Sequence, residues 1–381
     1  MTFYGDLPPV GHPISLRTEP ENNLAGLLGG HQYWVDSGTS ALALAVLDAK
    51  TYFPGLQQAR VIIPGYCCPD LVAACIYAGV EPVVVDIEEN DPAYNFECLR
   101  TQLDERVIAV IAVNFLGITE RLNELRQLIG SLGLRTRLIE DNAQWFPTCR
   151  AEVPADSDYA IFSFGRGKPL SLLGGGLLVA RVPIAGSVAA HIDAGDIPSL
   201  LLPLKMRAYN LLLSPLLYML LNRNPFMRLG ETTYIALKKI QALDSFRRSL
   251  LNSNFARYVT RKPALKIDYD EVLVARDLQQ LAAVTTPRAR QLLRYPLLCS
   301  SAACKDYLLL RLGKSGLGAT AMYPCAIDKI TGVDELVCVP EAIVNAQNFA
   351  RRFITLPMHG GVTQVYRKRI LAILREAKPA G

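Results

Sequence analysis

The strongest constraint on the fold is a regular alternation of apolar runs and helix-periodic segments through the first 180 residues. The apolar runs are rich in β-branched residues and hydrophobic throughout; they are Val61–Ile63, Pro82–Asp86, Val107–Asn114, Arg137–Glu140, Tyr159–Phe164 and Leu177–Ala180. Strands of this kind are typical of a sheet that is covered on both faces. A segment with helical periodicity, Ser40–Phe53, precedes them, and others, such as Pro69–Ala78 and Arg121–Leu132, separate them. The order predicts a doubly wound α/β sheet, which binds ligands beyond the carboxyl ends of its strands.

The rest of the chain follows a different pattern. A Leu-rich stretch occupies residues 199–221, and a long helix is predicted from Thr232 to Val259. A short predicted strand, Arg352–Leu356, and a basic helix near Val362–Lys378 come later. We therefore predict a large domain over residues 1–230, followed over residues 231–381 by a connecting helix and a smaller carboxyl-terminal domain.

Composition excludes several classes of protein. The chain has 381 residues, of which 50% are hydrophobic and 20% charged, so it is predicted to be globular rather than disordered. Its net charge of +5 is not gathered into a basic stripe, which argues against a nucleic-acid partner. Nine cysteines without a CxxC spacing argue against a disulfide framework and a zinc site. We read a reducing, cytoplasmic compartment, no secretory signal and no transmembrane segment.

Lys168 lies in a glycine-rich loop directly after a predicted strand, in the segment FSFGRGKPLSLLGGG. A lysine whose ammonium group is partly desolvated can form a Schiff base with an aldehyde. The flanking glycines would let the backbone approach a flat cofactor closely. The alternative is a solvated lysine on a surface turn, and Lys168 alone does not exclude it.

Two more features fall beside predicted strand ends or helix starts. Asp141 follows an apolar strand in RLIEDNAQW, where a carboxylate could hold a pyridine nitrogen protonated or simply cap the next helix. Ser37 or Thr39 opens the first long helix, and the N–H groups at such a terminus can bind an anion. The phosphate-binding turn, the aspartate and the lysine together have the layout of a pyridoxal-phosphate enzyme.

The sequence motifs around these residues resemble those of the DegT/DnrJ-type sugar aminotransferases, which are fold-type-I pyridoxal-phosphate enzymes. The matching segments are SGTSALALAV (Ser37–Val46), VIIPGYCCPDLVAACIYAGVEPVVVDIE (Val61–Glu88), LIEDNAQ (Leu138–Gln144), FSFGRGK (Phe162–Lys168) and RRFITLPMH (Arg351–His359). The resemblance implies a large lobe with a mixed, mostly parallel seven-stranded sheet and a small α+β lobe. It also implies a homodimer with active sites at the subunit interface.

The resemblance assigns a role to each site residue. It implies that Lys168 forms the aldimine with pyridoxal 5'-phosphate and that Asp141 pairs with the pyridine nitrogen. Gln144 would lie near the phenolic oxygen of the cofactor. Gly38, Thr39 and Ser163 would hold the phosphate, and Cys68 occupies the position where the family commonly stacks an aromatic ring on the cofactor. The family's asparagine for the partner subunit's phosphate has no counterpart in GETTY, residues 230–234, where a threonine is the candidate substitute.

The implied function is transfer of an amino group, with glutamate as the expected donor, to a keto sugar nucleotide or a similar biosynthetic ketone. Another pyridoxal-phosphate reaction, such as decarboxylation, condensation or elimination, remains open, as does a non-catalytic regulatory protein on the same fold. The Leu-rich segment has no charge between Ala208 and Leu221. We therefore expect Tyr209–Leu221 to pack inside the protein or against a second protomer rather than on lipid.

Overall fold

The computed structural model describes residues 5–19, 23–153, 156–195, 201–223, 232–261 and 278–376. Its centre is a seven-stranded sheet with the strand order β1-β7-β6-β5-β4-β2-β3. The strands are β1 (His31–Val35), β2 (Arg60–Pro64), β3 (Glu81–Val85), β4 (Val107–Val113), β5 (Arg137–Asp141), β6 (Tyr159–Ser163) and β7 (Gly176–Ala180). Only β7 runs against its neighbours β1 and β6, so the sheet is mixed and mostly parallel, as predicted.

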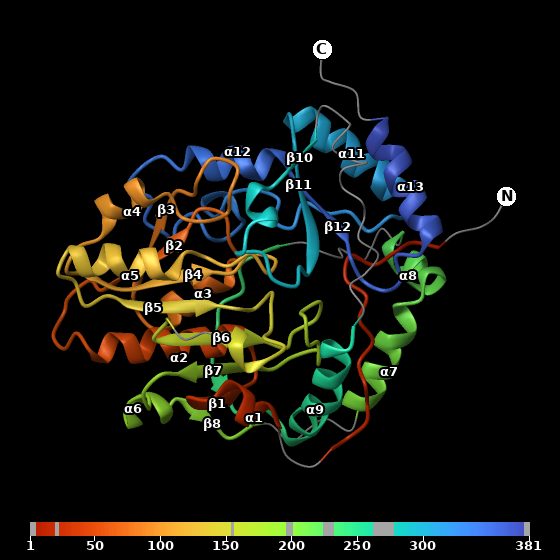
Figure 1. The fold of residues 1–381 in the computed structure, drawn as a ribbon. Coiled ribbons are helices and arrows are strands. Elements are labelled where there is room, and N and C mark those ends of the chain that lie inside the picture. The colour runs from red at the N-terminus through yellow and green to blue at the C-terminus, as the bar shows by residue number, and fades with distance from the viewer. Residues whose placement is uncertain are drawn as a thin grey trace.

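Helices cover both faces of this sheet (Figure 1). In chain order they include α2 (Gly38–Thr51), α3 (Asp70–Tyr77), α4 (Phe96–Gln102) and α5 (Leu122–Ser131). The sheet contributes to separate hydrophobic clusters on its two faces, one with α2 and α3 and one with α4 and α5. Strand β4 shows why the strands could be predicted from the sequence. Every residue from Val107 to Ala112 is buried, so both faces of the strand have to be apolar.

The carboxyl-terminal lobe is built on a three-stranded antiparallel sheet, at the upper right of Figure 1. It contains β10 (Leu278–Gln280), β11 (Arg294–Cys299), β12 (Phe353–Pro357), α11 (Ala302–Lys314), α12 (Val344–Arg352) and α13 (Gln364–Arg375). The predicted strand and basic helix near the end of the chain are therefore present. The lobe has its own hydrophobic cluster, which includes Leu297, Leu308, Leu356 and Leu374.

The connection between the lobes differs from the sequence prediction. Residues 232–239 have no regular secondary structure, β9 (Ile240–Gln241) pairs with β8 (Ile192–Asp193), and helix α9 spans only Ser245–Val259. The long helix predicted from Thr232 is wrong, because Asp244 starts the helix by accepting a hydrogen bond from Arg247 N (2.9 Å). The predicted domain boundary between residues 230 and 231 lies outside the described residues.

The Leu-rich segment forms two helices, α7 (Leu202–Leu212) and α8 (Pro215–Asn222), along the right edge of Figure 1. Leu202 and Met206 are buried, but α8 contains no buried residue. Of the two arrangements expected for Tyr209–Leu221, packing inside this chain does not hold for α8, and packing against a second protomer stays a prediction. Two further short helices are α1 (Asn23–Leu28) and α6 (Gly186–Ala189). No helix within the described ranges is long and apolar enough to cross a membrane.

Candidate active site

The start of helix α2 meets the end of strand β6. Ser37 is the N-cap, and its hydroxyl oxygen accepts a hydrogen bond from Ser40 N at 3.0 Å, which decides between Ser37 and Thr39 as the cap. A Cβ atom on Gly38 would lie only 2.7 Å from Ser163 Cβ, so the first turn of α2 and the last residue of β6 are in direct contact. The N–H groups of this turn face the carboxyl ends of the strands, where a helix terminus attracts anions.

Asp141 is the last residue of β5, and it is buried. Its Oδ1 accepts a hydrogen bond from Ala143 N at 2.8 Å, and the chain turns there without starting a helix. The alternative role as a helix cap is therefore excluded. Burial raises the pKa of Asp141, while the Ala143 N–H and the positive charge of Lys168 act in the opposite direction. No hydrogen bond from the described residues uses Oδ2, which leaves that oxygen for a ligand.

Lys168 lies in the loop between β6 and β7, where its backbone N–H closes a turn on Gly165 O (3.3 Å). Gly167 has a φ of 76°, a left-handed conformation that glycine adopts without strain. The side chain is half-buried, which does not match the alternative of a fully solvated surface lysine. Within the described residues, its ammonium group has no carboxylate partner closer than 4.0 Å.

One cavity of about 190 Å³ joins these elements. All the site residues predicted from the sequence line it: Gly38, Thr39, Cys68, Asp141, Gln144, Ser163 and Lys168. The cavity therefore has a helix N-terminus, a buried carboxylate and a primary amine around one space. Burial raises the pKa of the Cys68 thiol, the charge of Asp70 adds to this, and Lys168 opposes it, so Cys68 is a neutral, polarizable surface.

The cavity also contains a residue that the sequence reasoning missed, Tyr323 of the carboxyl-terminal lobe. Its hydroxyl accepts a hydrogen bond from Gln144 Nε2 (3.0 Å), while Gln144 Oε1 accepts one from Leu116 N (2.7 Å). Tyr323 N in turn donates to the hydroxyl of buried Tyr66 (3.2 Å). The sequence around Tyr323 has no motif that indicates a site residue, and its partner Gln144 is 179 residues away in sequence.

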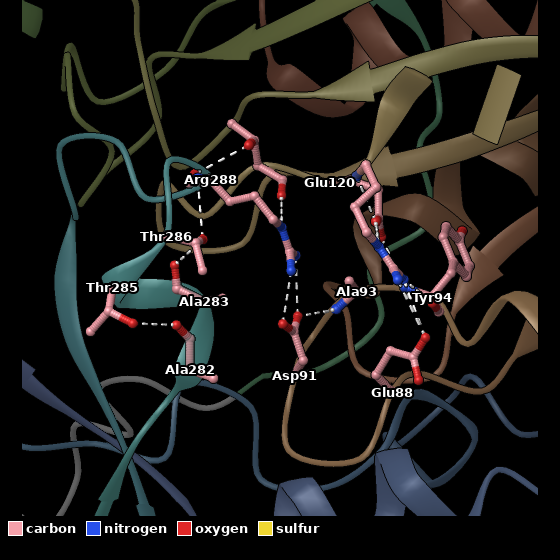
Figure 2. Close-up of polar contacts among 12 residues, drawn as sticks. Glu88, Asp91, Ala93, Tyr94, Glu120, Ala282, Ala283, Thr285, Thr286 and Arg288 are labelled. Carbon is pink, nitrogen blue, oxygen red and sulfur yellow. Dashed lines mark hydrogen bonds and ion pairs between the residues drawn. The ribbon is translucent and has the colours of Figure 1, made fainter. Parts of the chain in front are cut away.

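A second contact joins the two lobes near the site, as Figure 2 shows. Arg288 binds both carboxylate oxygens of Asp91, with Nη1 to Oδ2 at 2.8 Å and Nη2 to Oδ1 at 3.2 Å. The same guanidinium donates from Nε to Thr119 O at 2.8 Å. Thr119 belongs to the loop that follows β4, and that loop also contains Leu116, the donor to Gln144. Arg288 thus anchors the carboxyl-terminal lobe to an active-site loop.

The sequence model of the DegT/DnrJ/EryC1/StrS aminotransferase family matches residues 18–190. The match covers a little less than half of the chain. The matched residues contain every predicted site residue, whereas Tyr323 and Arg288 lie beyond the match. The resemblance expected from the motifs is therefore confirmed.

Curated relatives extend the comparison. The chain is 32% identical over 165 residues to a UDP-N-acetyl-3-dehydro-alpha-D-glucosamine 3-aminotransferase of Acidithiobacillus ferrooxidans, covering 42% of each protein. It is 29% identical over 157 residues to GDP-perosamine synthase of Vibrio cholerae, covering 40% of this chain and 41% of that one. The chain thus spans about two fifths of the length of these relatives. A dTDP-3-amino-3,4,6-trideoxy-alpha-D-glucose transaminase of Streptomyces venezuelae is 25% identical over 352 residues, or 91% of this chain and 82% of the relative.

Solved structures show the same fold. DesV from S. venezuelae superposes with a TM-score of 0.66 at 19% identity, covering 94% of this chain and 88% of that one. PseC from Helicobacter pylori, an aminotransferase involved in the biosynthesis of pseudoaminic acid, gives a TM-score of 0.64 at 18% identity, covering 93% and 88%. The predicted fold class, a mixed and mostly parallel seven-stranded sheet with a smaller α+β lobe, is confirmed, and these structures share it.

Proposed function

We propose that this protein is a pyridoxal-phosphate-dependent aminotransferase that moves an amino group from glutamate to a keto sugar nucleotide or a similar biosynthetic ketone. One observation carries the proposal: Lys168, Asp141 and the N-terminus of α2 come from separate segments of the chain, yet they line one cavity. The family match over residues 18–190 supports the reaction type, and the names of the curated relatives support the acceptor class.

The side chains around the cavity fit this cofactor. A phosphate requires hydrogen-bond donors and positive potential, which the first turn of α2 offers together with the hydroxyls of Thr39 and Ser163. A pyridine nitrogen requires a carboxylate partner, and Asp141 is buried with Oδ2 uncommitted. Only glycine at position 38 leaves Ser163 in place, since a Cβ there would displace it. We assign Gly38, Thr39 and Ser163 to the phosphate and Asp141 to the ring nitrogen.

When bound, pyridoxal phosphate supplies an aldehyde that condenses with amines and a ring that withdraws electrons from the adjacent carbon. Lys168 Nζ would hold the aldehyde of the bound cofactor and, once an amino donor took its place, would be the base that moves a proton from the Cα of that donor. The Asp141 carboxylate would keep a proton on the ring nitrogen, which would strengthen the electron withdrawal. Among the described residues that line the cavity, Lys168 is the only lysine, so holding the aldehyde and moving the proton would both fall to this side chain.

Gln144 and Tyr323 position the opposite side of the cofactor. Because Gln144 Oε1 is held by Leu116 N, its amide nitrogen is fixed as the donor towards Tyr323. We assign this pair to the phenolic oxygen, where the tyrosine hydroxyl keeps its own proton available for donation. Cys68, which lines the cavity, would contact the ring face through its sulfur, in place of an aromatic ring.

Borohydride reduction followed by peptide mapping tests the assignment of Lys168. The purified protein is expected to show a visible absorption band that borohydride bleaches, with the label on Lys168. Lys168→Ala should lose turnover and the label while still binding the cofactor. Lys50→Ala is the matched control, because Lys50 Nζ is occupied by Ala78 O (3.0 Å) and Gly79 O (3.1 Å) and does not line the cavity. A label on any other lysine would refute the proposal.

The reaction type has its own measurement. Glutamate alone should convert the bound aldehyde to the amine form, with release of 2-oxoglutarate in equal amount. Release of carbon dioxide or ammonia instead would indicate decarboxylation or elimination. The fold alone does not determine the acceptor. For example, 3-amino-5-hydroxybenzoic acid synthase has the same fold, with a TM-score of 0.64.

A further inference from the structure

A second cavity lies on the other side of the Lys168 loop. It has a volume of about 340 Å³, and Arg166 and Gly167 line it, while their neighbours Gly165 and Lys168 line the cofactor cavity. Four consecutive residues therefore separate the two cavities. A molecule that extends from the reacting amine past this loop would enter the second cavity.

The wall of the second cavity is mainly aliphatic. The amino-terminal segment contributes Leu7 and Val10, and the α7–α8 pair contributes Leu212, Leu213 and Leu221. The rings of Tyr209 and Tyr218 complete this wall. Apolar side chains around a concave space favour a ligand with an aliphatic body, since burial of that body removes apolar surface from water. The Leu-rich segment thus forms one wall of this cavity.

Two arginines supply positive charge at this cavity: the exposed Arg166 lines it, and the buried Arg294 lies behind its wall. Arg166 lines the cavity, and no carboxylate of the described residues forms an ion pair with it. Arg294 is only 4% exposed, yet its guanidinium donates only to neutral oxygens: Thr320 Oγ1 (2.5 Å), Gly318 O (3.0 Å) and Thr355 O (3.4 Å). Thr320 and Gly318 themselves line the cavity.

Other groups nearby do not supply the missing negative charge. Asp6, which precedes the lining residue Leu7, is already paired with Arg223 at 2.9 Å and accepts a hydrogen bond from Asn222. Arg294 Nε is buried without a hydrogen-bond partner in the described parts of the chain. Burial lowers the pKa of Arg294 to about 9, and the neighbouring Tyr218 and Tyr66 act in the opposite direction. An anionic ligand would offset this unneutralised charge.

We propose that the second cavity binds the non-reacting end of the ketone acceptor, and that this end combines an anionic group with an aliphatic body. This inference rests on the proposed function, because it places the reacting carbonyl of the same molecule at Lys168. Of the two acceptor classes proposed above, it selects a ketone that is not a sugar nucleotide. The anionic group is a phosphate ester or a carboxylate next to Arg166, and the aliphatic body lies against Leu212, Leu213 and Leu221.

Calorimetric titration of the cofactor-loaded protein tests this assignment. Decyl phosphate and decanoate, below their micelle-forming concentrations, are the probes for the two anionic groups, and decyltrimethylammonium is the probe of opposite charge. The anionic probe whose group matches the natural ligand should bind saturably and the cation should not. Saturable binding of UDP without binding of either decyl anion would overturn the inference in favour of a nucleotide site.

Variants locate the binding. Leu213→Trp fills the cavity and should abolish probe binding, while Leu310→Trp adds the same bulk on α11, where Leu310 is 55% exposed and outside the cavity. Arg166→Gln should weaken binding about tenfold through loss of a charge-assisted hydrogen bond, and Arg207→Gln on the exposed side of α7 should not. Unchanged binding in Leu213→Trp would refute the site.

Two further readouts separate this inference from its alternatives. Borohydride labelling of Lys168 with no probe binding would leave the proposed function in place and remove the inference. Probe binding without any label would keep the cavity as an anion site but remove its link to the acceptor. Sedimentation velocity of Leu213→Trp tests whether a second copy of this chain, and not a ligand, occupies the cavity. If this variant dissociates from an oligomer and the parent protein binds no probe, the proposal is overturned.

Discussion

Replacing Gly38 with alanine tests the contact on which the phosphate site depends. The added Cβ would lie 2.7 Å from Ser163 Cβ and 2.9 Å from Ser163 Oγ. Carbon atoms in ordinary contact are about 3.5–4.0 Å apart, so roughly 1 Å of overlap has to be relieved. Ser163 cannot retreat easily, because it ends β6 and pairs with Gly176 of β7.

The expected cost is the difference between two effects. Overpacking of a closely packed position costs about 1–3 kcal/mol. Alanine is a better helix former than glycine by up to about 1 kcal/mol in a helix interior and gains less at the first position of α2. Gly38→Ala should therefore lower the free energy of unfolding by about 1–2 kcal/mol. It should also weaken cofactor binding, since the turn that would hold the phosphate is displaced.

Urea denaturation of a double-mutant cycle gives the measurement. Ser163→Gly removes both clashing atoms, so the Gly38→Ala/Ser163→Gly double variant should recover at least about 1 kcal/mol relative to the sum of the single changes. Gly186→Ala is the matched control: Gly186 also opens a helix, α6, and a Cβ there meets nothing within 4 Å. Additive single effects, or an equal loss in Gly186→Ala, would refute the contact.

Three further changes test the structure around the site. Burial lowers the pKa of His359 to about 4, and its Nδ1 accepts a hydrogen bond from Gly361 N, so below pH 6.5 the unfolded chain binds a proton that the folded protein does not bind. The free energy of unfolding, measured by urea titration, should therefore fall by about 3 kcal/mol between pH 6.5 and pH 4. The fall should be less steep in His359→Gln. The half-exposed Arg288–Asp91 pair should show a coupling of about 1 kcal/mol in a double-alanine cycle, and additivity would contradict it. Tyr323→Phe should cost about 1 kcal/mol by leaving a buried amide unpaired and should shift the pH dependence of the cofactor's absorption band; an unchanged band would remove Tyr323 from the site.

The central sheet could be predicted because its information is local. Strands β2 to β7 match their predicted ranges to within a residue or two, since a strand buried on both faces has to be apolar throughout. Strand β1, HQYWV, was missed because it lies at the sheet edge, pairs only with β7 and keeps polar residues among its apolar ones. The helix expected from Thr232 failed because an extended segment and a capping aspartate interrupt it before Ser245.

The site was predictable only on one side. The site residues between positions 37 and 168 lie at or just after the ends of successive strands, and a mostly parallel sheet brings those ends to one edge. The family motifs also include these residues. Tyr323 and Arg288 reach the same region from the other lobe through contacts over more than 165 residues, for which a single sequence has no local signal. The exposure of α8 could not be predicted either. An apolar composition indicates that a helix is buried, but it does not indicate which surface covers the helix.

The exposed leucines of α8 are the remaining test of how this protein assembles. Leu216 is 57% exposed and Leu220 66% exposed, on the side of the helix pair away from the second cavity. Two such side chains bring about 1.5–3 kcal/mol each when they are fully buried, so a second protomer seated on them would gain substantially. Leu220→Glu should then shift a dimer towards monomer in sedimentation velocity at micromolar concentration, because the carboxylate would have to be desolvated. Leu310→Glu on α11 is the control and should leave the dimer intact. If Leu220→Glu sediments as the parent protein does and instead loses binding to vesicles of anionic phospholipid, α8 faces lipid and the expectation of a protomer contact is wrong.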